Sequence, residues 1–166
     1  MGQDKALLPF RGGPLAAAVA REVEQAAGSV TLVGHPDLGG IPDRHPGEGP
    51  LGGILTVLHH TSADWNLIVA CDMPEVSADF LKHLLAEAVR LDAAILLPYG
   101  PDGRPEPLCA IYHRRALEGL EAAFQRGIRK VTAAIQGLGA ARINVTEVAV
   151  FQNVNTPEDW SGYAAE

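Results

Sequence analysis

The chain has 166 residues, of which 47% are hydrophobic and 20% charged, and its formal net charge is −7. This length and composition predict one globular domain over residues 1–166, and the acidic balance argues against nucleic-acid binding, which normally needs a basic stripe. No stretch approaches the roughly 20 apolar residues of a membrane span, and Asp4 and Lys5 stand where a signal peptide would be apolar, so we expect a cytoplasmic protein without a membrane partner.

The first half of the chain alternates between helical and strand patterns. Helical periodicity predicts a helix over about 14–27, with Pro in its first turn, and a β-branched run predicts a strand over 29–34. Residues 35–50 are rich in Gly and Pro without a period, which indicates a long and therefore functional loop. A helix over about 51–61 follows, and then a continuous apolar strand over 65–71, of the type that is buried on both faces of a parallel sheet.

The second half continues the alternation. Its expected strands cover 93–98, 108–113 and 141–145. Its expected helices cover 77–90 with Ser77 as N-cap, 114–125, 130–136, and a last one that begins at Thr156 with Pro157 in its first turn. Strands and helices that alternate in this way, with right-handed crossovers, predict a three-layer α/β fold.

Three polar residues follow predicted strands or short apolar stretches, where open α/β sheets bind ligands. Asp72 comes directly after the strand 65–71 and could hold Mg²⁺, which takes one or two carboxylates together with substrate phosphates. Asn153 and Asn155 follow the apolar stretch 148–151 and offer neutral oxygens. The alternative for Asp72 is a helix or turn cap, and for the asparagines an Asx turn.

Positive charge is concentrated in one part of the chain, although the net charge is negative. The residues of this basic cluster are Arg114, Arg115, Arg126, Arg129 and Lys130. Such a cluster fits an anionic ligand, and a solvated helix face is the alternative.

Five segments in a fixed order resemble the molybdenum cofactor guanylyltransferase family over the whole chain. These segments read MGQDKALLPFRGGPL, EGPLGG, VACDMP, PLCAIY and FQNVNTPEDW. The resemblance implies a Rossmann-like nucleotidyltransferase fold with a mostly parallel sheet. It also implies an enzyme that transfers GMP from GTP to the phosphate of molybdopterin or the molybdenum cofactor, with Mg²⁺ as cofactor and pyrophosphate as the second product. Further partners would be molybdoenzymes or their chaperones.

The resemblance also implies roles for individual residues. Lys5 matches the lysine of the family signature and would hold nucleotide phosphates, Asp72 would carry Mg²⁺, and Asp43 would contact the nucleotide. Asn153 and Asn155 match a segment that faces the pterin. The acceptor phosphate would be bound by the basic residues Arg126, Arg129 and Lys130.

The N-terminus departs from the family signature, which has the form LAGGxSxRMGxDK and begins with a strand and a glycine-rich loop. This chain starts at the Met-Gly of its second half. Backbone N–H groups of such a loop cradle phosphate, and the absent strand would be central in the sheet. We therefore expect an apolar slot with unpaired strand edges, weak GTP affinity for this chain alone, and a natural protein that extends upstream of Met1.

Two other functions remain open. One is a related cytidylyl- or sugar-1-phosphate nucleotidyltransferase, because His35 stands near the position of a family asparagine and leaves base selection undecided. The other is a non-catalytic homologue that binds a molybdoenzyme or the pterin without turnover, which the missing glycine-rich loop would explain.

Overall fold

The fold is described here from a computed structural model, which covers residues 5–147, 149–154 and 163. Its main sheet has the strand order β3 (Trp65–Val69), β5 (Cys109–His113), β4 (Ile95–Tyr99) and β6 (Ala140–Asn144). β4 and β6 pair in parallel, whereas β5 pairs antiparallel with both β3 and β4. Strands β3, β4 and β6 therefore share one direction and β5 runs against them, so the described sheet is mixed, with two antiparallel pairings and one parallel pairing.

The connection from β4 to β5 is not the right-handed crossover that the sequence predicts. Residues 100–108 alone join β4 to β5, and they contain a turn in which the Gly103 N–H donates to the Gly100 carbonyl at 2.9 Å. A parallel return needs a crossover of a dozen or more residues, usually with a helix. This link is shorter than that, so the chain turns back antiparallel.

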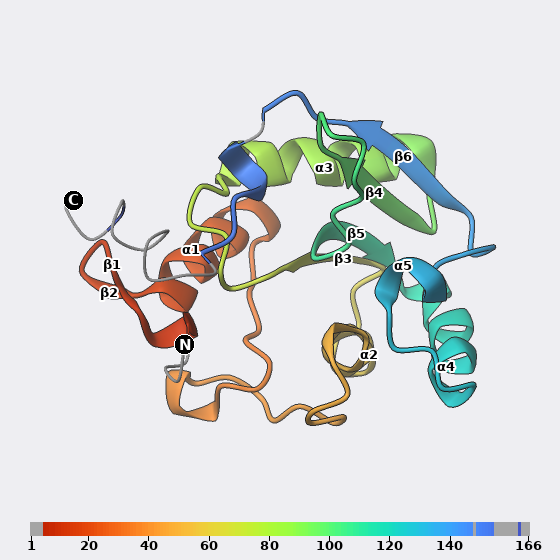
Figure 1. The fold of residues 1–166 in the computed structure, drawn as a ribbon, viewed down its shortest axis with the longest axis horizontal. Coiled ribbons are helices and arrows are strands. Elements are labelled where there is room, and N and C mark those ends of the chain that lie inside the picture. The colour runs from red at the N-terminus through yellow and green to blue at the C-terminus, as the bar shows by residue number, and fades with distance from the viewer. Residues whose placement is uncertain (1–4, 148, 155–162, 164–166) are drawn as a thin grey trace.

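Helices cover both faces of the sheet, as the three-layer prediction requires. On one face, α1 (Leu15–Ala27) and α3 (Ala78–Leu91) pack on Leu96, Cys109 and Ile111. The other face of the same strands packs against three helices, α2 (Pro50–His60), α4 (Leu117–Gln125) and α5 (Val131–Ala134). Side chains alternate between the two faces of a strand, so each strand supplies both cores. Figure 1 shows α3 above the sheet and α2 and α4 below it.

Local signals place several helix ends as expected. The Ser77 hydroxyl accepts a hydrogen bond from the Phe80 N–H at 3.3 Å and caps α3. Helix α2 begins at Pro50, one residue before its expected start, and the missing N–H of a proline costs nothing in a first turn. The expected last helix from Thr156 falls outside the described residues.

The N-terminal segment contains a small hairpin that the sequence did not predict. After the 3-10 helix η1 (Lys5–Leu7), strand β1 (Pro9–Phe10) pairs antiparallel with β2 (Gly13–Pro14). Arg11 and Gly12 form its tip with positive φ angles of 47° and 81°, a pair of values typical of a two-residue hairpin turn. Pro14 is consequently extended and precedes α1 instead of lying in its first turn.

The predicted strand over 29–34 is wrong. Residues 29–32 have no regular structure, and Val33 forms only an isolated parallel bridge with Ile41. A β-branched run becomes a strand only where a neighbouring edge is within hydrogen-bonding distance. In the described part of the chain, β3 pairs on one side only, with β5.

Besides η1, the described chain has three more short 3-10 helices, two of which are η2 (Pro36–Leu38) in the predicted long loop and η4 (Ala149–Phe151) after β6. A third, η3 (Arg114–Ala116), leads into α4. In the part of the chain that the structure describes, every helix is too short or too polar to cross a bilayer.

Candidate functional site

Lys5 and Asp72 meet at the carboxyl end of β3. The Lys5 Nζ atom lies 3.8 Å from Asp72 Oδ2, and the two side chains are 32% and 21% exposed. Both groups are therefore accessible to a ligand. Together they provide a cation for phosphate oxygens and a carboxylate for a metal ion. The structure thus brings together two predicted residues that are 67 positions apart in the sequence.

The tail after β6 also reaches Asp72. The backbone N–H of buried Val154 donates to the Asp72 carbonyl at 3.0 Å. This bond places the neighbouring Asn153, which is exposed, at the same edge of the sheet. The backbone of Asn153 therefore lies next to a residue that is bonded to Asp72, whereas Asn155 lies outside the described residues.

The donor set fits a magnesium ion that shares its ligands with a substrate. Within residues 5–147, 149–154 and 163, no group of three or more His, Cys, Asp or Glu side chains could hold a metal by itself. Mg²⁺ seldom needs such a cage, because it keeps waters and uses one or two carboxylates plus phosphates. Asp72 supplies the carboxylate at a partly exposed position, and substrate phosphates would complete the shell.

Asp43 is the third predicted nucleotide residue and lies in the long loop before α2. Its Oδ1 atom accepts hydrogen bonds from the Thr56 hydroxyl at 2.8 Å and from the His45 N–H at 2.9 Å. Sequence reasoning missed Thr56, whose only local signal is a hydroxyl among the apolar residues of α2.

The basic segment between α4 and α5 is not joined to the Lys5–Asp72 pair. The partly exposed Arg129 contacts its neighbours: its guanidinium lies 3.9 Å from the centre of the Phe124 ring, pairs with Glu48, and donates to the Phe124 carbonyl at 2.7 Å. Arg126 and Lys130 are exposed. Figure 1 shows α4 and α5 at the opposite end of the long axis from the β1–β2 hairpin.

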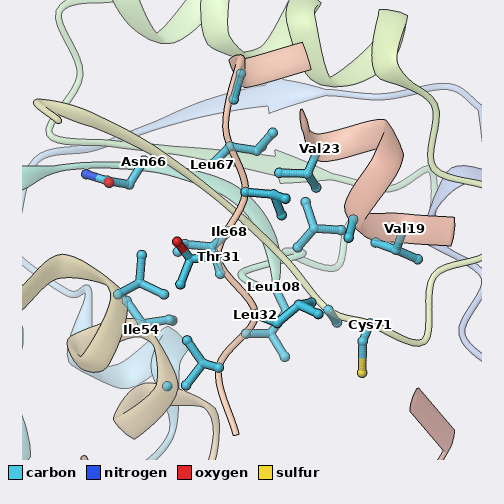
Figure 2. A pocket seen from close by; sticks show the side chains of 18 of the residues that line it. Val19, Val23, Thr31, Leu32, Ile54, Asn66, Leu67, Ile68, Cys71 and Leu108 are labelled. Atoms are coloured by element: carbon cyan, nitrogen blue, oxygen red, sulfur yellow. The ribbon is translucent and has the colours of Figure 1, made fainter. Parts of the chain in front are cut away.

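An apolar cavity of about 350 Å³ lies between the 29–33 segment and β3, and its lining includes Cys71 next to Asp72. Figure 2 shows side chains from α1, the 29–33 segment, α2 and β3 gathered around it, among them Val19, Val23, Thr31, Leu32, Ile54, Leu67 and Ile68. The cavity lies beside the edge of β3 that does not pair with β5. The sequence analysis expected an apolar slot with an unpaired strand edge, and this cavity beside the edge strand β3 has those two features.

Comparison with protein families gives a match over most of the chain. A family model described as the MobA-like NTP transferase domain matches residues 1–140. A molybdenum cofactor guanylyltransferase of Vibrio atlanticus is 32% identical over 167 residues, which cover 95% of this chain and 85% of that protein. One of Xanthomonas euvesicatoria is 36% identical over 171 residues, covering 97% and 86%.

Solved structures give the same fold. The molybdopterin-guanine dinucleotide biosynthesis protein A of Archaeoglobus fulgidus superposes with a TM-score of 0.82 at 28% identity, covering 98% of this chain and 89% of that one. A 2-C-methyl-D-erythritol 4-phosphate cytidylyltransferase of Thermus thermophilus superposes with a TM-score of 0.68 at 17% identity, which concerns the fold alone.

Proposed function

Because the chain belongs to the MobA-like NTP transferase family, we propose that it transfers GMP from GTP to the phosphate of molybdopterin or the molybdenum cofactor. The products are the guanine dinucleotide cofactor and pyrophosphate. Relatives named as molybdenum cofactor guanylyltransferases support this choice of substrates. The observation that carries it is the Lys5–Asp72 pair at the carboxyl end of β3, with Asn153 held alongside.

The reaction needs positioning and charge neutralisation more than proton transfer. An oxygen of the acceptor phosphate forms a bond to the α-phosphorus of GTP, while the bond from that phosphorus to the pyrophosphate oxygen breaks. The attacking phosphate is already ionised, so no general base is required. Two anions must approach each other, and Lys5 would bind and orient the nucleotide phosphates at this point.

Asp72 would hold the magnesium ion through its carboxylate. When bound, Mg²⁺ would neutralise phosphate charge and stabilise the departing pyrophosphate. Asp72 also accepts the Val154 N–H through its backbone carbonyl, so the residue would keep its place whether or not its side chain binds metal.

The acceptor would lie on the side of the tail. Asn153 and Asn155 would face the pterin. Arg126, Arg129 and Lys130 would contact a part of the acceptor that lies away from the transfer step, because their segment is not joined to the Lys5–Asp72 pair, and Arg129 also pairs with Glu48. Asp43 would contact the nucleoside.

Nucleotide titration tests the proposal. GTP with Mg²⁺ is titrated by NMR or calorimetry into this chain and into a version extended upstream of Met1 by a strand and glycine-rich loop of the form LAGGxSxR, with CTP as the control nucleotide. We expect tight, GTP-selective binding by the extended version and weaker binding by this chain. Turnover is measured as pyrophosphate release with molybdopterin as acceptor.

Two variants in the extended version locate the site. Lys5→Ala and Asp72→Asn should each weaken GTP binding about 10- to 100-fold, since a hydrogen bond to a charged group contributes about 1.5–3 kcal/mol. A matched surface pair, Lys82 and Asp79 at 3.7 Å on α3, is the control, and Lys82→Ala and Asp79→Asn should leave binding unchanged. Binding that survives both site variants would contradict the assignment, and no nucleotide binding by either version would contradict catalysis.

A further inference from the structure

A buried hydroxyl on α2 holds the carboxylate of Asp43. The side chain of Thr56 is almost fully buried, with 1% of the residue exposed, and its Oγ1 atom lies 2.8 Å from Asp43 Oδ1. The same oxygen accepts the Arg44 N–H at 3.0 Å. The hydroxyl proton can point either to Asp43 or to the Gly52 carbonyl at 3.0 Å, and the charged carboxylate is the stronger acceptor.

The backbone around Asp43 also packs against α2. The His45 N–H donates to Asp43 Oδ1 at 2.9 Å, so one carboxylate oxygen receives two donors. A Cβ atom on Gly52 would lie 2.8 Å from the His45 Cβ, so the close approach of loop and helix depends on a glycine there. The loop therefore contacts α2 at the Thr56 hydroxyl and at Gly52, which has no side chain.

The other side of the same loop packs on α4. The His45 ring lies 4.6 Å from the Phe124 ring, centre to centre, and Glu48 pairs with Arg129. The 43–48 segment is thus fixed between two helices, although it belongs to a long Gly- and Pro-rich loop.

These contacts leave the second oxygen of Asp43 for a ligand. Among the described residues, no donor is recorded for Oδ2, and the side chain is only half-buried. A carboxylate oxygen held in one position accepts N–H or O–H groups, which a nucleoside offers on its base and on its ribose.

We infer that Thr56 is a positioning residue, which holds Asp43 in the orientation that binds the nucleoside part of GTP. The inference rests on the proposed function. Thr56 does not touch the nucleotide; it acts through Asp43 and through the Arg44 N–H.

The test compares Thr56→Val with Thr56→Ser in a GTP–Mg²⁺ titration followed by the amide signals of Arg44 and His45. Valine keeps the shape but removes the donor and the acceptor, so the dissociation constant should rise about tenfold, and the Arg44 and His45 amides should exchange faster with solvent. Serine keeps the hydroxyl and should restore both values to within about twofold of the parent. Where turnover is measurable, Thr56→Val should raise KM for GTP and leave kcat within about twofold, because Lys5 and Asp72 are unchanged.

Two further variants separate positioning from a general structural defect. Thr61→Val at the other end of α2 removes a comparable hydroxyl, which accepts the Ala63 N–H at 3.1 Å, and should change neither binding nor the Arg44 amide. In an Asp43→Ala background, adding Thr56→Val should weaken binding no further, because the group through which Thr56 acts is gone.

The outcomes distinguish the two proposals. If the parent protein binds GTP and Thr56→Val binds it equally well, the role of Thr56 is overturned and the proposed function stands. The same holds if the effects of Asp43→Ala and Thr56→Val add independently. If the parent binds no nucleotide even in its extended version, the proposed function fails, and the inference fails with it whatever the amide exchange shows.

Discussion

Glu106 is a half-buried acid in the link between β4 and β5. Burial raises the pKa of its carboxyl above the ordinary value of 4.5, the nearby Asp102 carboxylate raises it further, and Arg104 opposes them. An acid whose pKa is higher in the folded state than in the unfolded state binds its proton more tightly when folded. Its contribution to the free energy of unfolding therefore falls as the pH rises from the unfolded pKa through the folded one.

Replacing Glu106 by Gln should remove this loss. We expect Glu106→Gln to raise the free energy of unfolding at neutral pH relative to the parent and to remove the loss of stability that the parent shows as the pH rises above about 4.5. Urea unfolding at several pH values measures both. The exposed Glu147→Gln is the control, and a parallel pH profile for Glu106→Gln and the parent would contradict the burial argument.

Helix α2 carries two adjacent glycines with different surroundings. A Cβ on Gly52 would lie 2.8 Å from His45 Cβ, whereas a Cβ on Gly53 would meet nothing within 4 Å. Gly52→Ala should destabilise the fold by about 1–3 kcal/mol, because the 43–48 loop must move away from the helix. Gly53→Ala should stabilise it by about 0.5–1 kcal/mol, because alanine is the better helix former.

Urea unfolding of the two single variants makes this comparison, and each serves as the other's control. The pair has the same chemical change in the same helix, so a difference in sign isolates the contact with His45. Equal effects of Gly52→Ala and Gly53→Ala would show that the loop does not depend on close approach to α2.

At the scale of the whole molecule, the described residues leave a cavity of about 350 Å³ beside β3. Its lining is mostly apolar, with the 29–33 segment on one side and β3 on the other (Figure 2). Lys5 lies beside Asp72 at the carboxyl end of β3, so a strand attached upstream of Met1 could enter the cavity from that end. It would run parallel to β3 and pair with the edge of that strand.

The extended version described above should therefore be more stable than this chain. We expect a gain in the free energy of unfolding of at least about 1.5 kcal/mol, the contribution of one buried Val or Leu side chain. An extension of equal length, with its apolar strand residues replaced by Ser and Asp, is the control and should give no gain. Equal stability of the two extensions in urea would show that the cavity does not take a strand.

Much of the local structure was predictable from the sequence alone, because it rests on neighbouring residues. The apolar run of β3, the Ser77 cap of α3 and a start of α2 near residue 51 each lie within a few positions of the structure that they specify. The position of Asp72 was predictable for the same reason, since it follows an apolar strand run at the carboxyl end of β3, where α/β sheets bind ligands; its role stays a prediction. The five segments that resemble the family are likewise each continuous in the sequence.

Only the tertiary structure decided which distant groups meet. The 29–34 run has the composition of a strand, yet it forms none, because a strand needs the backbone of a partner within reach and a cavity separates it from β3. Arg129, which the sequence places among the candidates for the acceptor phosphate, pairs with Glu48, far away in the sequence. Thr56 gains its role because a helix and a loop are packed so closely that its hydroxyl touches Asp43. Hydrogen bonds and ion pairs of this kind depend on distances in space, which sequence patterns do not contain.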